Sequence, residues 1–173
     1  GHARGWESEE WAAQLEVVDA AARRLGNGLG RDVGAVVTAD HGMIDVPAHR
    51  HVLLDAGDEL TEGLALMAGE PRMLHLYAES GAAESLTRAW QSREGERSWV
   101  LTRDEAINAG LFGPVVHDQA RPRIGDVLVA ARSSIAYYDN RLSDKGPQSM
   151  VGQHGSLTDQ ERIVPLIKLG AYA

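Results

Sequence analysis

The feature that most constrains the fold is the apolar run DVGAVVTA at residues 32–39, which stops abruptly at Asp40-His41-Gly42. The run is short, nearly all small or β-branched, and continuous rather than alternating. This pattern is typical of a strand buried on both faces, as in a parallel sheet covered by helices. Open α/β sheets place their sites at the carboxyl ends of strands, so Asp40 and His41 lie where site residues are expected.

An amphipathic helix is predicted over residues 8–25, just before this strand. Ser8 is a suitable N-cap, with acidic residues following in the first turn. Apolar residues recur at spacings of three and four and predict one buried stripe: Trp11, Leu15, Val18, Ala22 and Leu25. The glycine-rich GNGLG at 26–30 ends the helix. A helix followed by a buried strand is half of a βαβ unit.

The rest of the chain predicts an α/β fold with a small α+β insert. Strands are expected at 72–79, 98–102 and 124–132, and helices at 82–91 and 103–110. A long polar loop, 136–160, then leads to an apolar strand at 162–170. We therefore expect residues 1–69 in an α/β core with a parallel or mixed sheet and flanking helices. Residues 70–135 would form the insert, and residues 136–173 would return to the core.

Composition limits the possible functions. The net charge is −8, from 17 basic and 25 acidic residues, which argues against nucleic acid as a partner. No apolar run reaches the roughly 18 residues of a membrane span. The N-terminus has no apolar signal-peptide region, so a cytoplasmic location is expected. Cysteine is absent, so a metal would need His, Asp or Glu, which suits zinc, manganese or magnesium.

Asp40 and His41 are the first candidate metal ligands. Gly42 permits a sharp turn that would let both side chains reach one ion. The alternative is a capping aspartate beside a surface histidine, which a bare Asp-His-Gly favours. His2, in GHARGW, would by itself be an inert N-terminal histidine, of the kind that an expression tag leaves.

His154 is the other candidate ligand, in GQHGSLTDQE before the last predicted strand. Gly152 and Gly155 flank it and allow a close approach of the backbone. The alternative is a loop histidine beside a helix start, with Thr158 as N-cap and Glu161 as its capping-box partner. Both readings can hold together, because the capped turn would fix the loop.

The remaining histidines are weaker candidates. His49 and His51 are expected at a solvated surface, His75 inside a strand as a structural residue, and His117 in a loop without an evident partner. There is neither a glycine-rich phosphate loop nor a serine-hydrolase elbow.

Two motifs in this order give the chain a family resemblance. TADHGM at the end of a strand, followed by an insert and GQHGSLTDQERIVPLI, resembles the type I phosphodiesterase / nucleotide pyrophosphatase family of the alkaline phosphatase superfamily. GHARGWESEEW with the helix after it, RDEAINAGLFG and RIGDVLVAA are similar to the same family, so the resemblance covers nearly the whole chain. It implies an alkaline-phosphatase-like fold.

The resemblance also implies two divalent ions, usually zinc. Asp40 and His41 would bind one ion, and His2 and His154 the other. Family members carry further metal-binding aspartates and a threonine or serine nucleophile at positions that would precede Gly1. We therefore expect a C-terminal portion of a catalytic domain, whose partner is the missing N-terminal half. With two candidate ligands for each ion, this chain should bind metal weakly and not complete the covalent step.

The leading hypothesis is thus a hydrolase of phosphodiester or pyrophosphate bonds, acting on a small phosphate ester or nucleotide by two-metal catalysis. A phosphomutase, phosphonate hydrolase or sulfatase of the same superfamily is the nearest competitor. A second hypothesis is a non-catalytic α/β module that binds a partner with incomplete metal ligands. A third treats Asp40, His41 and His154 as ordinary polar loop residues, and it predicts that their side chains do not converge.

Overall fold

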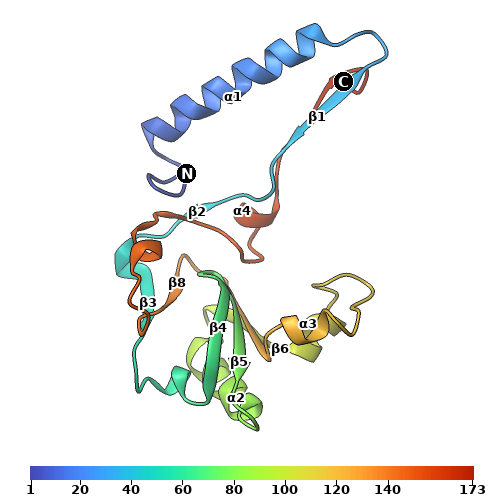
Figure 1. Cartoon of the computed structure of the whole chain (residues 1–173). Helices are drawn as coiled ribbons and strands as arrows, with labels where there is room; N and C mark the ends of the chain where they lie inside the picture. Colours follow the sequence, from blue (N-terminus) through green and yellow to red (C-terminus); the bar gives the residue numbers. More distant parts are fainter.

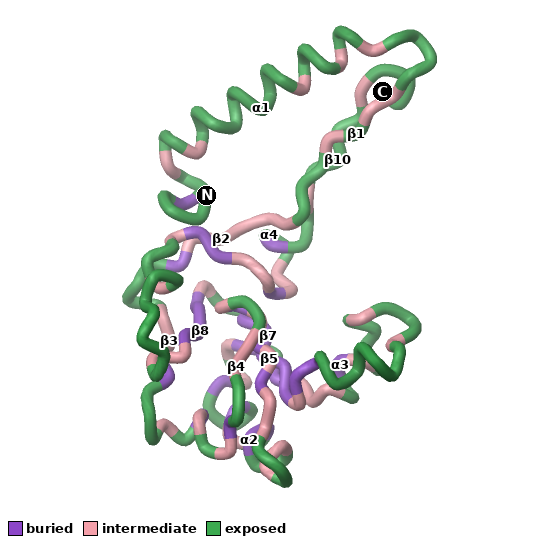
Figure 2. The backbone as a smooth tube through the Cα atoms, in the orientation of Figure 1, coloured by how far each residue is buried: buried purple, intermediate pink, exposed green.

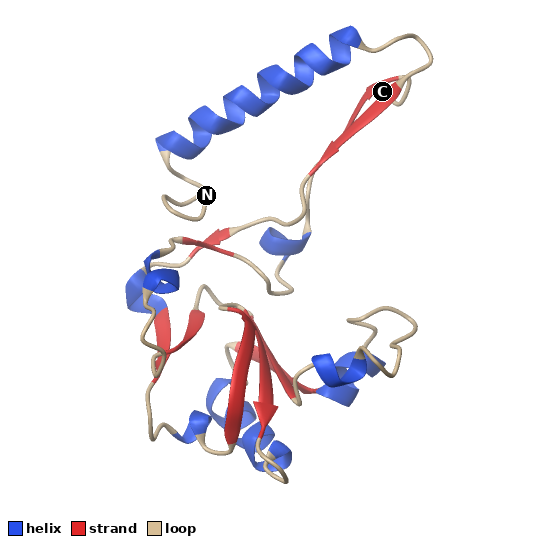
Figure 3. Ribbon diagram, in the orientation of Figure 1, coloured by secondary structure: helices blue, strands red, loops and turns tan.

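The computed structural model describes residues 1–173 and has a mixed α/β architecture (Figures 1 and 3). The helices are α1 (Glu9–Gly28), α2 (Ala83–Glu94), α3 (Arg103–Asn108) and α4 (Asp159–Arg162). The strands are β1 (Gly34–Thr38), β2 (Ile44–Asp45), β3 (His51–Leu54), β4 (Leu64–Glu70), β5 (Met73–Ala78), β6 (Ser98–Thr102), β7 (Val127–Ala131), β8 (Ala136–Asp139), β9 (Gly152–Gln153) and β10 (Leu166–Gly170). None of the helices combines the length and apolar character needed to cross a membrane.

A four-stranded antiparallel sheet forms the best-packed part of the molecule, in the order β4-β5-β7-β6. The main core of 13 buried residues joins this sheet to α2, and the indole of Trp90 is fully buried there. Three strands of this sheet, with α2 and α3, fall within residues 70–135, the range expected for a small α+β insert. The sheet also takes in β4, which precedes the expected boundary at residue 70, because β4 and β5 form one hairpin. The division into a core and an insert stays a prediction.

Three two-stranded pairs make up the rest of the strand structure. β1 pairs with β10 and β2 with β9, both antiparallel, whereas β3 pairs with β8 in parallel. In each pair a strand that precedes the four-stranded sheet in the sequence meets one that follows it. Figure 1 shows α1 with β1 and β10 as an arm that projects away from the sheet and α2.

The helix α1 begins as predicted, because the Ser8 side chain accepts a hydrogen bond from the backbone of Trp11 at 3.2 Å. The prediction that its apolar stripe is buried is wrong. No residue of α1 is buried, and Leu15 and Val18 are 50% and 55% exposed. The arm is mostly exposed in Figure 2. An apolar gap of about 470 Å³ separates the stripe from β1 and β10, so the helix faces these strands without packing closely on them.

The prediction that residues 32–39 form a doubly buried strand of a parallel sheet is also wrong in this chain. The strand β1 exists, but its only pairing is the antiparallel one with β10. Val36 is 47% exposed, and Ile167 on β10 is 48% exposed. A two-stranded ribbon with one partly separated helix cannot cover both of its faces, and this explains the exposure.

The long loop expected at 136–160 contains more structure than its polar composition indicated. It includes β8, where Tyr137 and Tyr138 are buried, and also β9 and the start of α4. The Tyr137 hydroxyl donates a hydrogen bond to the buried carboxylate of Glu94 at 2.6 Å. Glu94 comes from α2, whereas the Tyr138 hydroxyl donates to the carbonyl of Pro147 at 3.2 Å and accepts from Gln153 at 2.9 Å, within residues 136–160.

Candidate metal centre

Three segments meet between the arm and the four-stranded sheet, and each carries a histidine. The carbonyl oxygen of His2 accepts hydrogen bonds from the backbone of Val151 at 2.8 Å and Gly152 at 3.1 Å. The strand β2, which begins soon after His41, pairs with β9, which ends just before His154. The backbone therefore brings the N-terminal turn and two loops from opposite ends of the chain to one place.

The imidazoles of His2, His41 and His154 converge there. Each offers a nitrogen, and these nitrogens all lie within 4.8 Å of one another. The rings of His41 and His154 are stacked, with centroids 3.6 Å apart, and the His2 centroid lies 5.2 Å from that of His154. This convergence is contrary to the reading in which His41 and His154 are ordinary loop residues.

Backbone carbonyls orient two of the three rings. The Nδ1 of His2 is 2.9 Å from the carbonyl oxygen of Gly152, and the Nδ1 of His41 is 2.8 Å from that of Gly42. A carbonyl oxygen only accepts, so the proton of each neutral ring is on Nδ1. The Nε2 lone pair of each ring is then available for a metal ion, in the arrangement that metal-binding histidines commonly show.

The third imidazole is biased toward the neutral form that a metal requires. Burial lowers the pKa of His154, and the neighbouring His41 and His2 lower it further. The acidic side chains of Glu70 and Glu161 act in the opposite direction, and the net pKa is below 6.5. A neutral imidazole binds a metal ion without first releasing a proton.

Asp40 lies beside this group rather than in it. Its side chain is 88% exposed, and its Oδ2 is 3.7 Å from the Nε2 of His41. Its Oδ1 accepts a hydrogen bond from the backbone of His41 at 3.0 Å. The pairing of Asp40 with His41 on one ion, and of His2 with His154 on another, stays a prediction.

Gly42 is needed for a close approach, not for the sharp turn that we expected. Its φ does not lie in the left-handed region. Its backbone N–H donates to the carbonyl oxygen of Glu161 at 2.7 Å, and a Cβ at this position would lie 1.9 Å from the carbonyl oxygen of Gln160. Gly152 is similar, since a Cβ there would lie 2.8 Å from the carbonyl oxygen of Gly1.

The pattern of the type I phosphodiesterase / nucleotide pyrophosphatase family matches residues 1–157, which include all three histidines. The chain belongs to this family. No curated protein sequence matches the chain.

Several solved structures share the fold of this chain. Human ectonucleotide pyrophosphatase / phosphodiesterase 5 is 15% identical, with a TM-score of 0.73 over 98% of this chain and 44% of that protein. The murine protein is 16% identical, with a TM-score of 0.69 over 95% and 42%. Phosphonoacetate hydrolase from Sinorhizobium meliloti 1021, in complex with phosphonoacetate, is 24% identical, with a TM-score of 0.65 over 93% and 41%. This chain thus spans less than half the length of these proteins.

The side chains at the centre fit the metal dependence of this phosphodiesterase family. Three imidazoles are a donor set that zinc and other borderline divalent ions accept. Nitrogens bound to one zinc ion at about 2.0–2.1 Å lie roughly 3–4 Å apart. The 4.8 Å limit in this chain is only slightly wider, so small ring rotations would bring all three nitrogens to one ion.

The sequence did not predict a buried ion pair that lies next to the loops of His41 and His154. Arg72 and Glu161 form two hydrogen bonds of 2.7 and 2.8 Å, and their side chains are 0% and 1% exposed. The predicted capping box of Thr158 and Glu161 is absent, because the Thr158 hydroxyl donates to the Glu161 carboxylate and caps no helix N–H. The two charges are 89 residues apart, so no local pattern could reveal the pair.

The other histidines lie outside the candidate metal centre. His49 and His117 are exposed, and His75 is a structural residue of β5 whose Nδ1 accepts a hydrogen bond from the backbone of Gly125 at 3.2 Å. The prediction of a solvated His51 is wrong. Its Nε2 is buried without a hydrogen-bond partner, and its ring lies 4.8 Å from that of Tyr138, because residue 51 begins β3 alongside β8.

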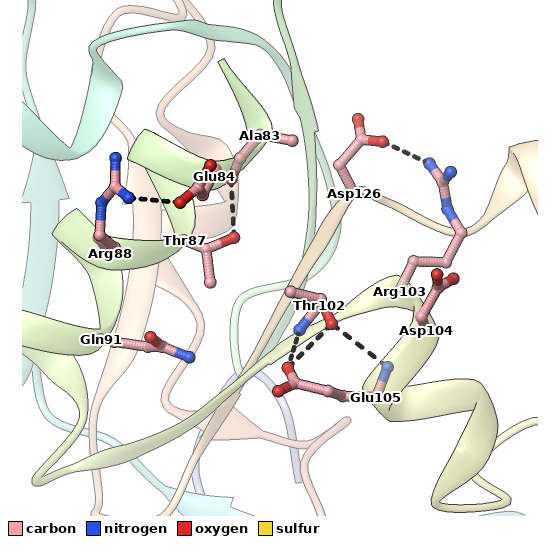
Figure 4. A pocket seen from close by; sticks show the side chains of 10 residues that line it. All are labelled: Ala83, Glu84, Thr87, Arg88, Gln91, Thr102, Arg103, Asp104, Glu105 and Asp126. Carbon is pink, nitrogen blue, oxygen red and sulfur yellow. Dashed lines mark hydrogen bonds and ion pairs between the residues drawn. The ribbon is translucent and has the colours of Figure 1, made fainter. Parts of the chain in front are cut away.

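A cleft of about 530 Å³ lies between α2 and α3, and nine of the ten residues that line it are polar or charged (Figure 4). Its charged groups are largely paired with one another, since Arg88 contacts Glu84 at 2.5 Å and Arg103 contacts Asp126 at 2.7 Å. None of the three converging histidines lines it. The histidine cluster is therefore the stronger candidate for chemistry.

Proposed function

We propose that this chain is the C-terminal portion of the catalytic domain of a metal-dependent hydrolase of phosphodiester or pyrophosphate bonds. The observation that carries the proposal is the convergence of His2, His41 and His154 in a chain of the type I phosphodiesterase / nucleotide pyrophosphatase family. The substrate would be a small phosphate ester or a nucleotide. An inactive variant of murine ectonucleotide pyrophosphatase / phosphodiesterase 5 was solved with AMP, which makes nucleotides the first substrates to test.

The chain's own residues would hold and orient two divalent ions, most simply zinc. Such ions stabilise the attacking and leaving oxygens of an in-line displacement at phosphorus. The carbonyls of Gly42 and Gly152 keep His41 and His2 in the tautomer that presents Nε2. Three imidazoles and the nearby Asp40 are too few ligands for two complete sites, so the remaining ligands and the threonine or serine nucleophile would come from the N-terminal half of the domain.

That N-terminal half would also be the main protein partner of the chain. The arm of α1, β1 and β10 has half-exposed apolar side chains on both sides, and an apolar gap of about 470 Å³ lies within it. Exposed apolar surface of this kind is typical of a face that another part of the protein covers. The chain also spans less than half the length of its structural relatives.

The test is hydrolysis of bis(4-nitrophenyl) phosphate by the protein that carries this chain together with its N-terminal half. His41→Ala should abolish the zinc-dependent activity, and His117→Ala, at an exposed histidine outside the cluster, should leave it unchanged. Full activity of His41→Ala would overturn the assignment of a metal ligand.

The same assay separates the alternatives. Phosphonoacetate is included because phosphonoacetate hydrolase shares the fold and is the relative with 24% identity. Turnover of phosphonoacetate or of a sulfate ester in place of the diester would favour a phosphonate hydrolase or a sulfatase. Conversion of a phosphosugar to its isomer would indicate a phosphomutase. Inactivity toward all substrates, with a bound protein partner, would favour the non-catalytic module.

A further inference from the structure

Glu161 touches both of the loops that carry the partly buried histidines. Its backbone carbonyl accepts a hydrogen bond from Gly42, next to His41, at 2.7 Å. Its side-chain Oε1 accepts a hydrogen bond from the backbone of Ser156, two residues after His154, at 3.0 Å. One residue therefore connects the backbone beside His41 to the backbone beside His154.

Arg72 holds the Glu161 carboxylate from the other side. Its Nε and Nη2 donate to the two carboxylate oxygens, and its remaining N–H groups donate to the carbonyls of Ala131, Ser133 and Ile135 at 2.7–3.3 Å. The guanidinium is 0% exposed and makes five hydrogen bonds, which matches its five donors. A planar fork with every donor occupied has a single orientation available to it.

The position of Arg72 in the fold connects this ion pair to the four-stranded sheet. Arg72 lies in the tight turn between β4 and β5, at the edge of the four-stranded sheet that contains the main core. Around the histidines, by contrast, regular structure is limited to the two-residue strands β2 and β9 and the short helix α4. The pair is thus one polar link between the sheet and the two histidine loops, alongside the hydrogen bond of 2.5 Å that the Ser156 hydroxyl donates to the carbonyl of Ala131 in β7.

We propose that the Arg72–Glu161 pair is a positioning device that sets the separation of His41 and His154 for metal binding. The metal part of this inference rests on the proposed function. Replacing a residue that orients metal ligands without binding the metal itself typically weakens metal binding by roughly 10- to 100-fold. The pair touches no ligand atom itself, so its effect would act through the backbone of the two loops.

The experiment measures Co²⁺ affinity of the 173-residue chain from the d–d absorption of the bound ion, at a temperature where circular dichroism shows every variant folded. Glu161→Gln and Arg72→Met should each weaken Co²⁺ binding by roughly 10- to 100-fold. Arg97→Met is the control, because Arg97, in the turn before β6, pairs at 2.6 Å with buried Glu94 at the end of α2 and contacts no histidine loop. It should lower the melting temperature and leave Co²⁺ affinity unchanged.

A double variant separates positioning from stability. Replacing a buried ion pair with apolar residues of similar size is often neutral for stability. Arg72→Met with Glu161→Leu should therefore recover much of the melting temperature lost in Arg72→Met, yet it still lacks the carboxylate that binds the backbone of Ser156. Weak Co²⁺ binding in this stable variant supports the proposal. Parental affinity in the double variant or in Glu161→Gln overturns it.

A metal-free readout keeps this inference distinct from the proposed function. Proton NMR of the metal-free chain reports the stacking of His41 on His154 through ring-current shifts of their imidazole protons. These shifts should collapse toward free-histidine values in Glu161→Gln and the double variant, and those of exposed His117 should not move. Unchanged shifts overturn the positioning role. Failure of the parental chain to bind any divalent ion would instead overturn the metal site, while the NMR shifts still decide the positioning role.

Discussion

Substituting the four predicted ligands one at a time tests the proposal that this chain binds a metal ion through its histidines. His2, His41 and His154 form one group of nitrogens, and Asp40 lies outside it with an 88% exposed side chain. We therefore expect each histidine-to-alanine variant to lose most of the affinity for a single Zn²⁺ or Co²⁺ ion. Asp40→Ala should lose little, because an exposed carboxylate 3.7 Å from a ligand nitrogen contributes mainly a screened charge.

The magnitude follows from the ligand count. Structural zinc sites with four protein ligands bind with apparent free energies of about 10–16 kcal/mol, or roughly 2.5–4 kcal/mol for each ligand. Loss of one ligand then weakens binding on the order of 100- to 1,000-fold. Asp40→Ala should weaken metal binding by less than about tenfold. The histidine rings are at least partly exposed, so the free energy of unfolding of the metal-free chain should change by only about 1 kcal/mol or less.

The assay is a Co²⁺ titration of the metal-free chain followed by competition with Zn²⁺, and elemental analysis should give fewer than two zinc ions per chain. A large loss in Asp40→Ala together with no loss in His2→Ala would refute the three-histidine arrangement. It would favour separate ions held by Asp40 with His41 and by His2 with His154. Two tightly bound zinc ions would show that the chain holds ligands beyond these four.

Three further predictions concern stability. Burial lowers the pKa of His51 from its ordinary 6.5, so below about that pH the unfolded chain binds a proton that the folded chain does not bind. The free energy of unfolding, measured by urea titration, should therefore fall as the pH drops below 6.5. It should fall less steeply in His51→Gln. Gly42→Ala places a Cβ 1.9 Å from the Gln160 carbonyl oxygen, so it should lower the free energy of unfolding by about 1–3 kcal/mol and weaken Co²⁺ binding. An unchanged midpoint of urea unfolding would contradict the close approach. Leu15→Glu, at a half-exposed site, should change the free energy of unfolding of the chain by only about 0.5 kcal/mol. Trp90→Ala, in the core, should lower that free energy by about 3–5 kcal/mol. Equal losses in the two variants would contradict the difference in burial.

Local structure could be predicted well from the sequence where neighbouring residues determine it. The Ser8 cap, the strand at 98–102 and the helix after Thr102 all depend on contacts within a few residues. Burial could not be predicted in the same way. The stripe with Leu15 and Val18 has the spacing of a packed helix, but spacing specifies which side chains share a face and not whether another segment covers that face.

The candidate site shows the same division. The motifs around His41 and His154 identified the histidines, because the family resemblance attaches to short continuous stretches. Their mutual arrangement depends on two-residue strands and on hydrogen bonds such as that from Val151 to the carbonyl of His2, which carry no sequence signature. The position of Asp40 outside the imidazole group was for this reason not predictable from its place next to His41.

Glu161 shows why a correct local pattern can still give the wrong partner. A threonine followed three residues later by an acidic residue predicts a capping box, in which Glu161 would bind the backbone N–H of Thr158. Thr158 does lie at the N-cap of α4, but the Glu161 carboxylate turns inward to Arg72 and the backbone of Ser156. A carboxylate that is 1% exposed needs a charged partner, and only the tertiary structure supplies one, 89 residues away. The residue that local reasoning places at a helix end is therefore the one that ties the two histidine loops to the sheet.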